Sequence, residues 1–95
     1  MTVGVLKLYI SINGANSLKE KRQIIKSLKE RMKSRFNASV AEVEYNDTWK
    51  NAVLGIACVS NDNRHVDGLM SSMVNFVEND GRVYMMDYTT ERITL

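Results

Sequence analysis

The residues with the clearest chemical potential are cations that gather between Ser17 and Phe36. This segment holds eight Lys/Arg and two Glu, a formal charge of +6, whereas the rest of the chain carries −4. On a helical wheel, five of these cations fall within an arc of roughly 80° and span about 20 Å. This basic stripe consists of Lys19, Arg22, Lys26, Lys29 and Lys33. A row of such groups suits the phosphates of a nucleic acid.

A solvated helix face is the alternative interpretation of the stripe, because lysines keep surfaces soluble. However, successive cations of the stripe lie three or four residues apart. The repulsion between these like charges costs about 1–2 kcal/mol of helix stability in total. Cations at the helix start, including Lys21, also oppose the helix dipole. The wheel places Lys21 and Arg35 near the apolar side, where we expect their stems to run past the core edge. We include Lys21 with the stripe as a candidate phosphate contact.

Other reactive residue types are isolated in the sequence. As a general base His65 would need a nucleophile and an orienting carboxylate. Asp62 is near in sequence, but Cys58 has no geometric claim to be the nucleophile, so we expect no catalytic residue. Cys58 falls on the same alternate positions as the residues of its strand that are expected to be buried, so it is interpreted as a core residue. Trp49, in a predicted loop, can either stack on a partner or pack over the sheet edge. We retain Tyr9, Trp49 and His65 as candidate partner contacts.

Composition excludes several classes of protein. One His and one Cys cannot supply the four ligands of a structural zinc site, and we expect no metal or cofactor. A lone cysteine excludes an intrachain disulfide and fits a reducing cytoplasm. No apolar run approaches the roughly 20 residues of a membrane span. The first residues lack the basic segment of a signal peptide, so we expect a cytoplasmic protein.

Six elements are expected to position these residues. Residues 3–12 alternate as a strand with one buried face. Ser17 and Glu20 form a capping box, in which the Glu20 carboxylate is expected to reach back to the Ser17 N–H. The helix that begins there has its apolar positions at helical spacing up to Phe36, and Asn37 is a plausible end. The chain is completed by two strands at 38–45 and 52–60, a helix up to Glu78 and a strand at 83–90. The acidic residues of the strand at 38–45 are expected to point outward.

This order predicts an α+β fold formed by a single domain, residues 1–95. Short connections and right-handed crossovers give a ferredoxin-like βαββαβ sandwich, a four-stranded antiparallel sheet with two helices on one face. The other face would expose an apolar surface, to which Tyr84 or Tyr88 can add. Its expected members are Val5, Val53, Ala57 and Val59. Such a surface suits a homodimer or a partner protein.

Two phosphate-binding arrangements known on this topology fit the chain poorly. RNA-recognition motifs stack bases on aromatic residues of both central strands, whereas here Tyr9 stands alone. The loop Asn13–Asn16 can offer backbone N–H groups to an anion, as in acylphosphatases. That loop lacks the arginine of an acylphosphatase, so phosphate hydrolysis is a minor alternative.

Several blocks of the chain resemble the YlxP-like family of uncharacterised bacterial proteins. The most specific block is Ser17-Leu18-Lys19-Glu20-Lys21-Arg22, and others are Phe36-Asn37, Val40-Ala41-Glu42-Val43, Val59-Ser60-Asn61 and Phe76-Val77-Glu78. The resemblance implies a ferredoxin-like fold and no established activity. Genes of the family often stand beside genes for translation and ribosome-maturation factors, which implies work on RNA or the ribosome.

The leading hypothesis is a non-enzymatic binding module for RNA or a ribosomal particle that uses the basic stripe. Phosphate contacts position a protein without reading sequence, so little base specificity is expected. The alternative is a protein-interaction module, or a regulatory homodimer, that works through the open sheet face.

Overall fold

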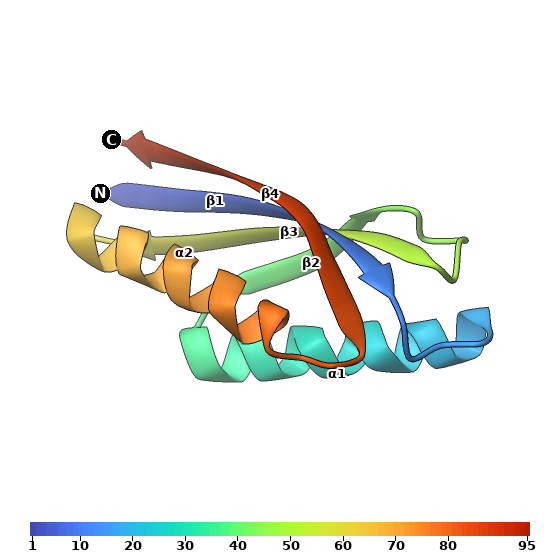
Figure 1. Cartoon of the computed structure of the whole chain (residues 1–95). Helices are drawn as coiled ribbons and strands as arrows, with labels where there is room; N and C mark the ends of the chain where they lie inside the picture. The colour runs from blue at the N-terminus through green and yellow to red at the C-terminus, as the bar shows by residue number, and fades with distance from the viewer.

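The computed structural model describes all residues, 1–95, and has one sheet layer and one helix layer. The elements are β1 (Thr2–Ile12), α1 (Leu18–Phe36), β2 (Ser39–Glu44), β3 (Asn51–Ser60), α2 (Asn63–Glu78) and β4 (Val83–Thr94). The strands form an antiparallel sheet in the order β2-β3-β1-β4. Both helices lie on one side of it, and the two termini are neighbours at one end (Figure 1). The predicted βαββαβ sandwich is confirmed.

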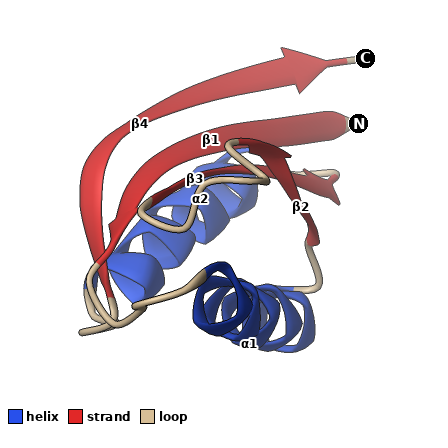
Figure 2. Cartoon of the chain, turned by 90° about the vertical axis from the view of Figure 1, so that its right-hand side faces the viewer, coloured by secondary structure: helices blue, strands red, loops and turns tan.

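The sheet and the two helices form separate layers (Figure 2), and the core lies between them. Leu6, Leu8 and Ile10 alternate along β1 and are fully buried, as the period of two in the sequence predicts. The helices cover them with apolar side chains at helical spacing. From α1 these are Ile24, Ile25, Leu28 and Met32, and from α2 they are Val66, Met70, Met73, Val74 and Val77.

The ends of both helices follow local sequence signals. Ser17 caps α1, and its hydroxyl accepts a hydrogen bond from the Glu20 N–H at 3.1 Å. The Glu20 carboxylate accepts from the Asn16 N–H at 2.7 Å, one residue earlier than the predicted Ser17. Asn37 ends the helix in the left-handed conformation (φ 49°), which asparagine tolerates well. Asp62 caps α2 and accepts from the Arg64 N–H.

A bulge in β4 decides which of its side chains face the helices. Asp87 pairs with Tyr9 and Met85 pairs with Ile10, so Met86 is an extra residue between them. Tyr84 therefore lies on the open face, opposite Ser11. Tyr88, opposite the buried Leu8, lies on the helix side instead. The strand also continues to Thr94, beyond the predicted end at Thr90, because its polar end pairs with the start of β1.

Candidate functional site

The basic stripe lies on the solvent-exposed part of α1. Lys19, Arg22, Lys26 and Lys33 are exposed, and Lys29 is half-buried. Among these five residues only Lys26 has a carboxylate within 4.0 Å, that of Glu30 at that limiting distance. No carboxylate from a neighbouring strand neutralises the row. The positive charge of the stripe is therefore largely uncompensated within the protein.

Lys21 is not part of this exposed surface, and its inclusion among the phosphate contacts was wrong. Its side chain is fully buried rather than extended past the core edge. The ammonium donates hydrogen bonds to the backbone carbonyls of Tyr45 and Thr48, and it lies 2.7 Å from Glu42 Oε2. The ammonium therefore has two hydrogen-bond acceptors and one counter-charge inside the protein, the kind of partners that a buried cation needs. A phosphate in solution cannot reach it.

The partner carboxylate, Glu42, also lies where the sequence did not predict it. It shares the inward side of β2 with Val40, and its side chain is only 13% exposed. A bulge then makes Val43 the extra residue, so that Glu44 pairs with Val53. Glu44 consequently faces outward, as predicted, and meets Lys7 at 4.0 Å across the open face.

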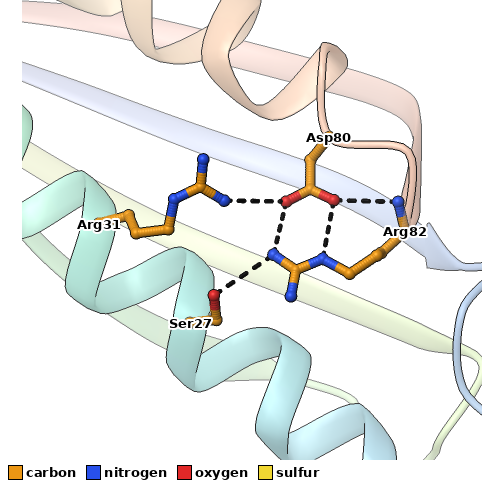
Figure 3. A network of polar contacts seen from close by, with 4 residues as sticks. All are labelled: Ser27, Arg31, Asp80 and Arg82. Carbon is orange, nitrogen blue, oxygen red and sulfur yellow. Dashed lines mark hydrogen bonds and ion pairs between the residues drawn. The ribbon is translucent and has the colours of Figure 1, made fainter.

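A second cationic surface lies on the other flank of α1, between that helix and the end of α2. Asp80 receives two side-chain hydrogen bonds from Arg82, at 3.0 and 2.7 Å, and one from the Arg82 N–H (Figure 3). Arg82 also donates to Ser27, and Arg31 reaches the same carboxylate at 3.5 Å. The hydrogen bond from Arg82 holds the pKa of the Asp80 carboxyl below its ordinary value, although burial opposes the shift.

Two aromatic rings complete this surface, which we call the interhelical cleft. Phe36 and Phe76 meet edge to face with their centroids 5.7 Å apart. The guanidinium of Arg31 lies 4.7 Å from the Phe76 ring centre, and that of Arg35 lies 5.6 Å from both rings. Arg35 has no carboxylate within 4.0 Å. Sequence reasoning missed this cleft because Arg82 and Phe76 join α1 only through the fold; the i,i+4 pair Arg31/Arg35 was the one local signal.

The three candidate partner contacts do not converge on one place. Tyr9 is half-buried on the open face, with the Lys7 ammonium 5.4 Å from its ring centre. Trp49 is half-buried against the core, which agrees with the packing interpretation. His65 is exposed in the first turn of α2, beside a shallow hollow that includes Phe36 and Leu69. None of the three lies in the basic stripe.

The loop before α1 is not the anion cradle that its sequence allows. The N–H groups of Asn13 and Gly14 both donate to the Arg82 carbonyl, at 2.8 and 3.1 Å. The Asn16 N–H is taken by Glu20, as described above. Three of the four amides in the Asn13–Asn16 loop are therefore occupied by the protein itself. Cys58 is buried as predicted, and burial raises the pKa of its thiol.

Two further features concern metals and membranes. The structure groups no three His, Cys, Asp or Glu side chains in a way that could hold a metal ion. Neither helix has the length and apolar character needed to span a membrane.

Comparison with known proteins places this chain among relatives of unknown function. The family described as "Protein of unknown function (DUF503)" matches residues 3–90. An uncharacterised protein of Bacillus subtilis (strain 168), YlxP, is 33% identical over 76 residues, which cover 80% of this chain and 83% of that protein. The family resemblance noted in the sequence is thereby confirmed, and no catalytic family is indicated.

Solved structures with a similar fold share little sequence with the chain. A structural-genomics protein, YJCS, has a TM-score of 0.62 at 9% identity and covers 97% of this chain and 99% of its own. A dimeric ferredoxin-like protein from an uncultured marine organism has a TM-score of 0.50 at 10% identity, with coverages of 98% and 94%. At such identities these similarities bear on the fold alone.

Proposed function

Since the chain belongs to the DUF503 family, whose function is unknown, we propose that it is a binding module for structured RNA that contacts phosphates through the basic stripe. The observation that carries this proposal is the uncompensated charge of the stripe. Four of its five members are exposed, and only Lys26 has a carboxylate as near as 4.0 Å.

The electrostatic cost of placing so many cations along the stripe supports a binding role for it over that of a merely solvated helix face. Like charges at i,i+3 and i,i+4 destabilise a helix by about 0.2–0.5 kcal/mol per pair. Carboxylates interspersed along the stripe would remove that cost, yet of the two glutamates in α1 Glu20 caps the helix and only Glu30 approaches the stripe, 4.0 Å from Lys26. A polyanion relieves the repulsion by replacing the counterions of the stripe with its own phosphates.

The experiment compares two triple variants that remove the same amount of charge. Arg22→Gln/Lys26→Gln/Lys33→Gln neutralises exposed stripe positions, whereas Lys7→Gln/Arg64→Gln/Arg92→Gln neutralises three cations outside α1. Affinity for a structured ribosomal RNA fragment is measured by fluorescence anisotropy at several salt concentrations. We expect the stripe variant to bind about tenfold or more weakly, with a log K–log[salt] slope shallower by about 3. The control should stay close to the wild type.

The alternative, docking through the open face, is supported by a local apolar patch. Val59, Val3 and Ile93 lie in a row across β3, β1 and β4, and the exposed Val5 adjoins them. Val53, which we expected in this surface, is instead buried. Apolar contacts tolerate salt, so partner binding that survives both the stripe variant and high salt would favour this patch and contradict the RNA proposal.

A further inference from the structure

The interhelical cleft has the size of a small-ligand site and a polar lining. Its volume is about 700 Å³, within the usual range of ligand pockets. Only two of its eleven lining residues are hydrophobic, so the ligand it suits is polar. Its α2 side is lined by polar residues, Ser72, Asn75 and Asn79, which carry one hydroxyl and two side-chain amides.

The charges in the cleft are unbalanced. Its lining holds three guanidinium groups, from Arg31, Arg35 and Arg82, and a single carboxylate, from Asp80. The formal excess is therefore two positive charges. A phosphate monoester carries a charge of about −1.5 to −2 at pH 7 and would neutralise that excess.

The three arginines do not have equal roles. Arg82 is fixed, because it holds Asp80 through two side-chain hydrogen bonds and also reaches Ser27. Arg31 is 57% exposed in its side chain and touches Asp80 only at 3.5 Å, the outer limit of a hydrogen bond. Arg35 has no acidic partner. Arg31 and Arg35 thus keep most of their donors for another anion.

The Phe76 ring holds these two arginines near each other. Their guanidinium carbons lie 4.7 and 5.6 Å from its centre, close enough for cation–π attraction. Stacking on a ring restricts the planar fork of each side chain and leaves its edge free for oxygen ligands. Two such forks one helical turn apart suit a tetrahedral oxyanion, which offers several acceptors at once.

We propose that the interhelical cleft binds a phosphate monoester, held by Arg31 and Arg35, with the organic part of the ligand against the amide-bearing side of α2. The phosphate can belong to a free mononucleotide or to the 5′ end of an RNA strand, since both present the same dianion. The site uses a different flank of α1 from the basic stripe, so it does not depend on the proposed RNA contacts there.

The test uses paired probes that differ only in the phosphate. Binding of adenosine 5′-monophosphate is compared with that of adenosine, and a 5′-phosphorylated hexaribonucleotide is compared with its 5′-hydroxyl form, by isothermal titration calorimetry. The variants are Arg31→Gln/Arg35→Gln and, as a charge-matched control outside α1, Lys7→Gln/Arg64→Gln. Circular dichroism and thermal melting of each variant establish that it is folded.

We expect at least one phosphorylated probe to bind tenfold or more tightly than its unphosphorylated counterpart. The Arg31/Arg35 variant should lose that preference and the Lys7/Arg64 control should keep it. Preference for the mononucleotide alone identifies a free ligand, and preference for the RNA alone identifies a strand end. Equal binding of both members of each pair, or equal loss in the two variants, overturns the proposal; neither result bears on salt-dependent binding by the stripe.

Discussion

At the scale of single residues, Lys21 has the most unusual environment. A lysine in an apolar core is tolerated only when each ammonium proton has an acceptor, because desolvating a charge costs several kcal/mol. Here two acceptors are backbone carbonyls of the β2–β3 loop and the third partner is Glu42. Lys21 therefore joins α1 to β2 and to that loop, and its role is structural.

This arrangement predicts a strong and asymmetric effect of mutation. Lys21→Met should lower the free energy of unfolding by about 3–5 kcal/mol, because it leaves Glu42 buried without its counter-charge. The double variant Lys21→Met/Glu42→Leu should recover a large part of that loss, since no uncompensated charge then remains. Urea denaturation of both single variants and the double variant measures the coupling. Additive losses would show that the two residues do not act as a pair.

The sequence predicted individual residues well where local periodicity decides their position. The buried positions of β1 and the cap at Ser17 follow from spacing alone, and the structure agrees. The burial of Lys21 could not be predicted in this way, because it depends on the ion pair with Glu42. That residue is 21 positions away in the sequence, and only the fold brings the two together. For the same reason the link from Arg31 to Asp80 could not be anticipated.

At the scale of elements, the approach of α2 to the sheet depends on a glycine in β1. A β-carbon built on Gly4 would lie 2.5 Å from the Val66 Cγ1 atom of α2, and 3.1 Å from the sulfur atoms of Cys58 and Met70. Real β-carbons do not come so close to other atoms, so either the helix or the strand would have to move. The first half of α2 can therefore pack tightly only because position 4 has no side chain.

Alanine substitutions at two glycines should consequently have opposite effects. Gly4→Ala should destabilise the protein by about 1–3 kcal/mol through overpacking. Gly68→Ala, in the exposed middle of α2 with nothing within 4 Å of the added carbon, should stabilise it by about 0.5–1 kcal/mol. Thermal and urea unfolding of the two variants test both signs. A neutral Gly4→Ala variant would mean that the contact between α2 and β1 is looser than described.

The strand bulges mark the limit of prediction at this scale. Simple alternation puts Tyr84 and Tyr88 on the same face, and the extra residue Met86 separates them. A bulge depends on how two paired strands fit together, so its position cannot be read from one strand. The open face thereby gains Tyr84, while Tyr88 lines a groove beside α2.

At the scale of the whole molecule, positive charge is concentrated in one helix, α1. The segment from Ser17 to Phe36 carries +6, and the remaining residues, which form the sheet and α2, carry −4. Such a separation gives the molecule an electrostatic polarity, which would orient the proposed RNA partner toward α1 during approach. With Lys21 excluded, the two exposed flanks of α1 carry this field: the basic stripe on one side and the arginines of the interhelical cleft on the other.

The network around Asp80 connects three parts of the molecule and should make its overall stability depend on pH. Its carboxyl group, which is 7% exposed, lies between α2 and β4 and binds Arg31 of α1. Its pKa is lowered in the folded state, mainly by the hydrogen bond from Arg82, so its stabilising contribution is present above its ordinary pKa of 3.8. That contribution is lost as the pH falls through the lower, folded-state pKa.

Asp80→Asn should therefore destabilise the protein by about 1–2 kcal/mol at pH 7, where the charged hydrogen bonds are intact in the wild type. The difference between the two proteins should shrink below pH 3.8 and vanish in stronger acid, because the wild-type carboxyl is then protonated as well. Urea unfolding between pH 2 and pH 7 measures this convergence. Asp47→Asn, which makes the same charge change in an exposed loop, is the control. A constant gap across that range would show that Asp80 acts through shape rather than through its charge.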